Sequence, residues 1–187
     1  MNLKSKKQAM KELSTPISPR GNKISADPSK TSTKENGIIR AYAVNTHQGI
    51  SRNYNEDRVS IILNISKNGT KAAFFAIYDG HGGSNCCDFL SENLHQFILN
   101  SKKFPSHPRQ AIIEGMRLAE EKFMAKVKGR YTMQQELDRS GSCAIVALIV
   151  GDDCYIANLG DSRAVLSTCQ GKPLYSLSRD HKPTDTN

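Results

Sequence analysis

The 187-residue sequence predicts an α+β fold, a layered sandwich in which antiparallel strands pack against helices. Short β-rich segments are separated by turn signals, and at least four of them are joined to a neighbour by a tight turn. Two amphipathic helical segments follow one another in mid-chain instead of alternating with strands. This order argues against an alternating β-α-β fold, which would indicate a parallel sheet.

The first 36 residues differ in composition from the rest of the chain. They hold eight basic and three acidic residues, and thus +5 of the formal net charge of +8, with much Ser, Thr and Pro and few large apolar residues. Because such a segment buries little apolar surface, we expect residues 1–36 to be a disordered basic tail and residues 37–187 to form one domain. A solvated extension explains the tail's charge better than a nucleic-acid or membrane surface, so no specific nucleic-acid partner is expected.

Cysteine usage and hydropathy indicate the compartment. The five cysteines are odd in number and form no C-x-x-C pair, which argues against a disulfide framework and against a zinc site. No window approaches the roughly 18 apolar residues of a transmembrane helix, and the amino terminus lacks the apolar core of a signal peptide. We therefore expect a cytoplasmic or nuclear protein, monomeric, with reduced thiols and no membrane association.

The expected domain opens with β-rich segments. Residues 38–44 favour a strand, and the polar residues 46–55 favour a loop. Two further β-rich segments, 59–65 and 72–78, flank Asn68-Gly69, which is the strongest short-range hairpin signal. These two segments are therefore expected to be antiparallel neighbours.

The two strands of this hairpin meet acidic residues at the end away from the turn. Glu56-Asp57 precedes the first strand, and Asp79-Gly80-His81 follows the second. Since the turn lies at the opposite end, the hairpin brings these carboxylates to the same edge of the sheet. Asp-Gly is also a common turn dipeptide, so a tight turn with a solvent-exposed histidine is the alternative interpretation.

Both helical segments carry an apolar stripe that predicts packing on a sheet. The first is expected to begin at Ser84 as N-cap and to end by Pro105 and Pro108. Cys86-Cys87 at its start is interpreted as packing. The apolar residues are Leu90, Leu94, Phe97 and Ile98 in the first segment, and Ile112, Met116, Ala119, Phe123 and Val127 in the second.

The last part of the expected domain is a meander of strands. Residues 143–150 are apolar on every side, which predicts a strand buried on both faces. After a turn at Gly151, short strands are expected at 154–159, 164–168 and 174–177, separated by further turns.

The acidic edge carries groups that suit the hydrolysis of a phosphate ester. Crowded carboxylates need charge compensation, and because no lysine lies among them, one or two divalent cations are the simplest compensation. Such cations lower the pKa of a bound water toward neutrality. Arg52 can grip a phosphate with its planar guanidinium, and His81 can protonate a departing alkoxide. The chain has no G-x-x-x-x-G-K-[ST] loop and no G-x-G-x-x-G turn, which disfavours nucleotide-dependent transfer.

Five ordered motifs between residues 38 and 183 closely resemble those of the metal-dependent protein serine/threonine phosphatases of type 2C. They are Arg52-x-x-x-Glu56-Asp57, Tyr78-Asp79-Gly80-His81-Gly82-Gly83, Ser140-Gly141-Ser142-Cys143-Ala144, Ala157-Asn158-Leu159-Gly160-Asp161-Ser162-Arg163 and Asp180-His181-Lys182-Pro183. The resemblance implies two stacked antiparallel sheets flanked by helices, an α-β-β-α sandwich. It also implies an enzyme that hydrolyses phosphoserine and phosphothreonine in phosphoprotein substrates.

The resemblance further implies two Mg²⁺ or Mn²⁺ ions at the acidic edge. Asp79 would bridge them, the carbonyl of Gly80 would bind one of them, and Glu56 and Asp57 would reach their bound waters. Asp161 matches the position that contacts a more weakly held third metal ion, although it could instead merely fix the turn in which it lies.

By the same resemblance, Arg52 would hold the phosphate and His81 would act as the general acid. Two late aspartate motifs of the family, Asp-Gly-x-Trp-Asp and a later Asp-Asn, have no counterpart here, and the chain contains no tryptophan. We therefore expect residues 37–187 to be a truncated catalytic domain whose second half is missing. The alternative function is a catalytically inactive fragment, a binding or regulatory module with an incomplete metal cage.

Overall fold

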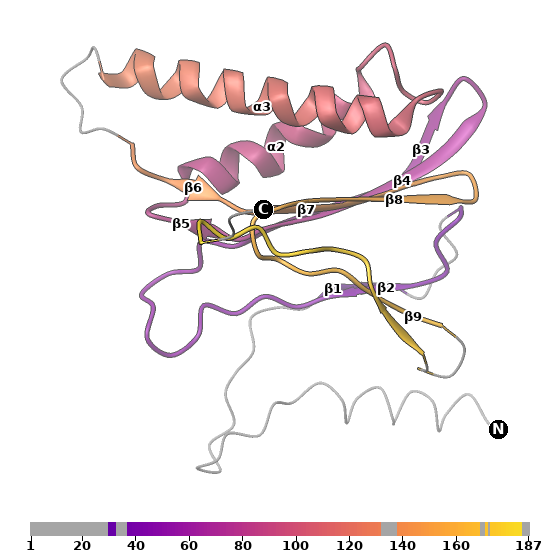
Figure 1. The fold of residues 1–187 in the computed structure, drawn as a ribbon, viewed down its shortest axis with the longest axis horizontal. Helices are drawn as coiled ribbons and strands as arrows, with labels where there is room; N and C mark the ends of the chain where they lie inside the picture. Colours follow the sequence, from indigo (N-terminus) through magenta and orange to yellow (C-terminus); the bar gives the residue numbers. More distant parts are fainter. Residues whose placement is uncertain (1–29, 33–36, 132–137, 169–170, 172, 185–187) are drawn as a thin grey trace.

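The computed structural model describes residues 30–32, 37–131, 138–168, 171 and 173–184. Its centre is an antiparallel four-stranded sheet in the order β3-β4-β7-β8, and both helices lie on one face of this sheet (Figure 1). The strands are β3 (Arg58–Lys67), β4 (Thr70–Tyr78), β7 (Ala144–Val150) and β8 (Asp153–Leu159), and the helices are α2 (Asn85–Leu99) and α3 (Pro108–Tyr131).

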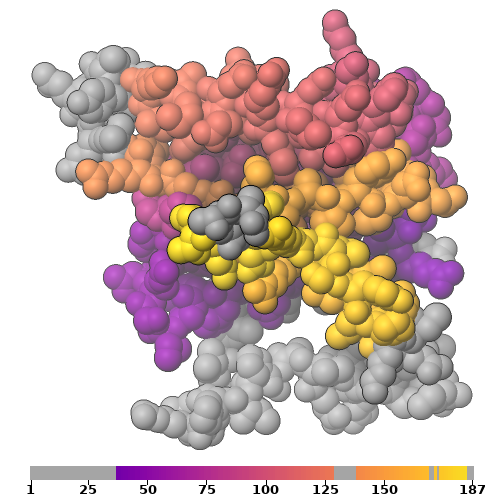
Figure 2. Space-filling model, in the orientation of Figure 1, coloured from indigo at the N-terminus to yellow at the C-terminus, as the bar shows by residue number. Residues whose placement is uncertain are grey.

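Short antiparallel pairs surround the central sheet. The pairs β1-β2 and β10-β9 lie on the face opposite the helices, and β5-β6 lies at one end of the sheet (Figure 1). Figure 2 shows the segment that carries β9 and β10, in yellow, extending across this view of the molecule from its centre. The expected α+β layering, with antiparallel sheets and two helices, is confirmed. The short strands are β1 (Lys30–Ser32), β2 (Tyr42–Val44), β5 (Gly80–His81), β6 (Gly141–Ser142), β9 (Val165–Ser167) and β10 (Leu174–Ser176).

The β3-β4 hairpin forms where the sequence predicted it. Asn68 and Gly69 have φ values of 51° and 77°, as a two-residue turn with left-handed backbone at both positions requires. The antiparallel register pairs Lys67 with Thr70 beside this turn and Arg58 with Tyr78 at the far end. Residues 55–57 and 79–81 therefore leave the sheet at the same edge.

The hydrophobic core lies between the helices and one face of the sheet. Alternate residues of β4 and β7 are buried there, with Phe74, Tyr78, Val146 and Leu148 each fully inaccessible. The apolar stripes of both helices close the core from above. Their buried members are Cys87, Phe89, Leu94, Ile98, Ala111, Ile112, Ala119, Phe123 and Val127.

Three expectations about strands need correction. On the helix side of β7, Ala144, Val146 and Leu148 are buried and Val150 is partly buried. On its other face only Ile145 is buried, because the short pairs β1-β2 and β10-β9 cover that face incompletely. The strand expected over residues 38–44 is described at Tyr42–Val44, where it pairs with β1. β1 itself lies within residues 1–36, so that segment is not disordered throughout. The rest of the predicted tail lies outside the described residues.

No helix in the described part of the chain is long and apolar enough to cross a membrane.

Candidate active site

The hairpin ends form a polar pocket of about 170 Å³ at the edge of the sheet. Five of the seven predicted site residues line it. They are Arg52, Glu56, Asp57, Asp79 and Gly80, and His47, Gln48, Tyr54 and Asn55 complete its wall. The convergence predicted from the hairpin is thus present in the structure.

Glu56 is the most enclosed acid of the pocket, with only 8% of its surface exposed. Its Oε1 accepts a hydrogen bond of 2.6 Å from the backbone N–H of Gly83, and its Oε2 accepts one of 3.2 Å from the Arg52 guanidinium. Both carboxylate oxygens are therefore engaged within the protein. The Arg52 side chain is 70% exposed, so its guanidinium remains accessible to an anion from solvent.

The environment of Asp57 disfavours the ionised form of its carboxyl group. Partial burial raises the pKa of its carboxyl group, and the neighbouring Asp79 raises it further, against the opposing effect of Arg58. The backbone N–H of Asp57 donates to Asn55 Oδ1 at 2.9 Å, which closes a tight polar turn before β3. A cation bound between Asp57 and Asp79 would relieve their mutual repulsion.

Gly80 occupies a position that no other residue fits. A Cβ atom there would overlap the backbone oxygen of Glu56 and the sulfur of Cys87. The bare backbone lets the chain following β4 approach the acidic turn closely, so that Gly80 lines the pocket together with Asp57 and Asp79.

His81 is not among the residues that line the polar pocket. It pairs with Gly141 in the β5-β6 ladder, and a Cβ atom on Gly141 would overlap the imidazole ring. The imidazole lines an adjacent, largely apolar groove of about 570 Å³ whose walls include Phe123 of α3 and Leu159 of β8. The structure therefore places His81 next to the pocket, on the neighbouring strand pair.

Asp161 also lies outside the polar pocket and is connected to it through Cys143. The Cys143 backbone N–H donates to the Asp79 carbonyl at 2.9 Å, and its thiol lies 3.6 Å from Asp161 Oδ1. Burial raises the pKa of the Cys143 thiol, and Asp161 and Asp79 raise it further as neighbouring charges, against a backbone hydrogen bond at Asp161 that lowers it. The thiol is therefore a neutral spacer between the two carboxylates.

A bidentate ion pair and a backbone hydrogen bond hold the turn that carries Asp161. Arg163 donates to both carboxylate oxygens of Asp180, at 2.8 and 2.7 Å, and the backbone N–H of His181 donates to the carbonyl of Gly160 at 2.9 Å. The last two motifs recognised in the sequence thus fold onto each other and fix this turn.

The oxygen donors of the pocket suit Mg²⁺ or Mn²⁺ in kind. Carboxylates and a backbone carbonyl are the hard ligands these ions prefer, and Asp57, Asp79 and Gly80 offer them from one wall. Among the described residues, however, no three His, Cys, Asp or Glu side chains gather closely enough to hold a metal ion by themselves. The described side chains of the pocket therefore do not form a complete metal site by themselves.

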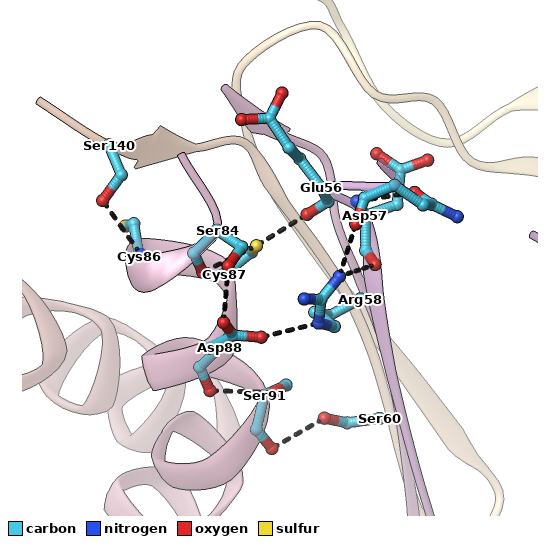
Figure 3. A network of polar contacts seen from close by, with 11 residues as sticks. Glu56, Asp57, Arg58, Ser60, Ser84, Cys86, Cys87, Asp88, Ser91 and Ser140 are labelled. Atoms are coloured by element: carbon cyan, nitrogen blue, oxygen red, sulfur yellow. Dashed lines mark hydrogen bonds and ion pairs between the residues drawn. The ribbon is translucent and has the colours of Figure 1, made fainter. Parts of the chain in front are cut away.

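A network behind the pocket was not anticipated from the sequence. Arg58, Asp88, Ser84 and Cys87 connect the acidic turn to the first turn of α2 (Figure 3). Ser84 precedes the helix as predicted, but its hydroxyl donates to Asp88 Oδ2 at 2.7 Å and caps no backbone N–H. Two signals pointed to this network: a basic residue directly after Glu56-Asp57, and an acid four residues after the N-cap.

The fold and its oxygen-lined pocket define a layered antiparallel protein with a candidate cation site. The sequence profile of the family described as Protein phosphatase 2C matches residues 41–187. The chain therefore belongs to the protein phosphatase 2C family.

Curated relatives agree with this assignment. The chain is 32% identical over 122 residues to "Probable protein phosphatase 2C 45" of Oryza sativa subsp. japonica, an alignment that covers 65% of this chain and 40% of the relative. It is 34% identical over 130 residues to "Probable protein phosphatase 2C 11" of Arabidopsis thaliana, covering 70% of this chain and 32% of the relative. The chain thus spans about a third of the length of the curated relatives it matches.

Solved structures share the fold. A serine-threonine phosphatase 2C from Toxoplasma gondii superposes with a TM-score of 0.53 at 22% identity, over 72% of this chain and 48% of that one. A C. elegans sex determining protein superposes with a TM-score of 0.61 at 21% identity, over 88% of this chain and 37% of that one.

Proposed function

We propose that this protein hydrolyses phosphoserine and phosphothreonine in phosphoprotein substrates with the help of two Mg²⁺ or Mn²⁺ ions. The observation that carries the proposal is the polar pocket, in which an exposed arginine and the oxygen donors of the acidic turn and of Asp79-Gly80 share one small space. Bound divalent cations would supply a water acidic enough to attack phosphorus at neutral pH. We further propose a monomer located in the cytoplasm or nucleus.

The residues of the chain would divide the work as follows. Asp79 and the Gly80 carbonyl would hold the cations, and Asp57 would orient water beside them. Glu56 would fix Arg52 through their ion pair, and the exposed Arg52 guanidinium would bind the phosphate of the substrate. His81, on the adjacent strand pair, would protonate the departing serine or threonine oxygen. Asp161, beyond Cys143, would serve a weaker third cation.

Phosphate release from a phosphothreonine peptide, measured with the full 187-residue chain at saturating Mn²⁺ and in EDTA, tests the proposal. We expect slow release that requires Mn²⁺ and is lost in Asp79→Asn, while Asp152→Asn, an exposed acid in the β7-β8 turn, behaves as wild type. Release that is independent of Mn²⁺ or unaffected by Asp79→Asn would refute it. No release at all would instead support the non-catalytic binding or regulatory module.

A further inference from the structure

Arg58 begins β3 directly after the acidic turn, and its side chain points back onto that turn. Its NH1 group donates to the backbone carbonyls of Asn55 and Asp57, each at 2.8 Å, and its Nε donates to Asp88 Oδ1 at 2.6 Å. One guanidinium therefore connects two carbonyls of the turn to the first turn of α2 (Figure 3).

Asp88 is itself held in place from the helix. Its second oxygen, Oδ2, accepts the hydroxyl of Ser84 at 2.7 Å, so both carboxylate oxygens have a partner. An acidic side chain in the first helical turn is also favoured by the helix dipole. The carboxylate that receives Arg58 thus has a fixed direction on a rigid element.

The middle carbonyl of the acidic turn is held by the same helix. The thiol of Cys87 donates to the backbone oxygen of Glu56. The carbonyls of Asn55, Glu56 and Asp57, which precede the β3-β4 ladder, are therefore all bound by side chains (Figure 3). The Glu56 carbonyl thus binds α2 through Cys87, and its carboxylate binds Arg52 and the N–H of Gly83.

We propose that Arg58, held by Asp88, is a positioning residue for the candidate active site. It fixes the backbone of residues 55–57 against α2, and this sets where the Glu56 and Asp57 carboxylates stand relative to Asp79. We call the contacts of Arg58 with Asp88 and with the carbonyls of Asn55 and Asp57 the Arg58 clamp. Its role in catalysis rests on the proposed function, whereas the contacts themselves are a property of the fold. Lysine could not replace arginine here, because a single ammonium cannot reach two carbonyls and a carboxylate in the diverging directions of the planar guanidinium.

Amide hydrogen exchange in the metal-free chain tests the clamp without any assay of activity. The variants are Arg58→Met, Arg58→Lys and Asp88→Asn. Arg117→Met is the control, since Arg117 forms an exposed ion pair with Glu121 within α3. The backbone N–H of Asp57 donates to Asn55 and that of Gly83 donates to Glu56, so both amides report on the position of the acidic turn. We expect Arg58→Met to speed exchange of these two amides about tenfold relative to the core amide of Val146. Arg58→Lys should rescue little of this change. Exchange that rises no more at Asp57 and Gly83 than at Val146 would overturn the proposal.

Mn²⁺ titration of the same variants tests the use of the clamp. We expect Arg58→Met and Asp88→Asn each to weaken Mn²⁺ binding about tenfold, and the double variant to be no weaker than either one, because the two residues act as a unit. Arg117→Met should bind as wild type does. Equal affinity in wild type and variants would show that the clamp does not serve the site and would overturn the proposal. A wild-type chain that binds no Mn²⁺ would contradict the proposed function, and the exchange measurement would still decide the role of Arg58.

Discussion

Asp57 carries the clearest electrostatic strain among the pocket residues. Burial and the nearby Asp79 both raise the pKa of its carboxyl group, so the folded chain holds this proton more tightly than the unfolded chain does. By linkage, ionising Asp57 costs the metal-free fold stability as the pH rises through the range of this group. An acid that weakens its own fold is typical of a site built to bind a cation.

Asp57→Asn should therefore stabilise the metal-free protein at neutral pH. We expect its melting temperature in EDTA at pH 7 to lie about 2 °C above that of wild type. This gain should shrink as the pH falls toward about 4, where the unfolded aspartate also becomes protonated. Asp152→Asn, which neutralises an exposed acid, is the matched control. A gain that grows on acidification would contradict the assignment of the strain to Asp57.

His81 tests a different step of the proposed chemistry. If its imidazole protonates the leaving group, His81→Gln should slow release from a phosphothreonine peptide about 10²-fold and release from p-nitrophenyl phosphate much less, since nitrophenolate leaves without a proton. His107→Gln, at an exposed histidine between the helices, should change neither rate. Equal slowing of both substrates by His81→Gln would exclude the general-acid role.

The sequence predicted the pocket better than it predicted what surrounds it. Glu56, Asp57, Asp79 and Gly80 converge because a two-residue turn fixes the register of the hairpin, and this turn is legible from Asn68-Gly69 alone. The contacts of Arg58 with Asp88 and of Cys87 with Glu56 join residues about 30 positions apart. These contacts depend on where α2 packs against the sheet, and no local sequence pattern specifies that position.

Helix α2 ends without a basic residue in its own last turn, and the β3-β4 hairpin supplies one. The Lys67 ammonium donates to the carbonyl of Leu99 at 2.6 Å and to that of Ser101 at 3.4 Å. It also lies 5.5 Å from the centroid of the Phe104 ring. A strand side chain thus satisfies helix-end carbonyls and adds a positive charge where the helix dipole favours one.

Lys67→Met should destabilise the fold by about 1 kcal/mol or more, since it leaves the helix-end carbonyls without their charged donor and keeps most of the side-chain volume. Lys71→Met, an exposed lysine on β4 of the same hairpin, is the control and should be nearly neutral. Urea unfolding followed by circular dichroism measures the difference. Coincident midpoints for the two variants would show that Lys67 does not stabilise the end of α2.

The sequence predicted the positions of the helices and of the late strands closely, because their apolar periods and turn residues are local signals. The expected continuous meander was wrong, because β8 pairs with β7 whereas β9 and β10 form a separate two-stranded sheet. The sequence overestimated the length of β2, which is described at Tyr42–Val44. It also overestimated the burial of β7, because that burial depends on how completely the rest of the molecule covers the second face of the sheet. Asn64, with φ of 59° at an irregularity between Ile62 and Ile65, is likewise a consequence of strand pairing and twist.

The two faces of the central sheet are covered unequally. The helices cover one face, whereas the described residues on the other face form short strand pairs, with a pocket of about 210 Å³ between the layers. Large apolar side chains remain exposed on β4, β9 and β10; they are Ile77, Val165, Leu166, Leu174 and Tyr175. Within the described residues, the acidic edge is therefore supported mainly from its helix side, through the contacts of Arg58 and Cys87.

The small number of available oxygen donors in the pocket predicts weak metal binding by this 187-residue chain. Both oxygens of Glu56 are used by Gly83 and Arg52, so the free donors of the pocket are Asp57, Asp79 and the Gly80 carbonyl. Mg²⁺ and Mn²⁺ favour six oxygens, and two adjacent dications repel each other unless several carboxylates share the charge. Water must fill the remaining positions in such a site, and each water contributes less than a carboxylate does.

We therefore expect Mn²⁺ to bind the isolated chain with a dissociation constant on the order of 10⁻⁴ M or weaker, the range of oxygen sites with few charged ligands. Calorimetric titration at pH 7 measures it, and the affinity should fall as the pH is lowered through the raised pKa of Asp57, because the proton competes with the metal. Asp79→Asn should abolish binding, and Asp152→Asn should leave it unchanged. Submicromolar affinity in the wild-type chain would mean that further oxygens reach the ion and that Asp57, Asp79 and Gly80 are only part of its ligand set.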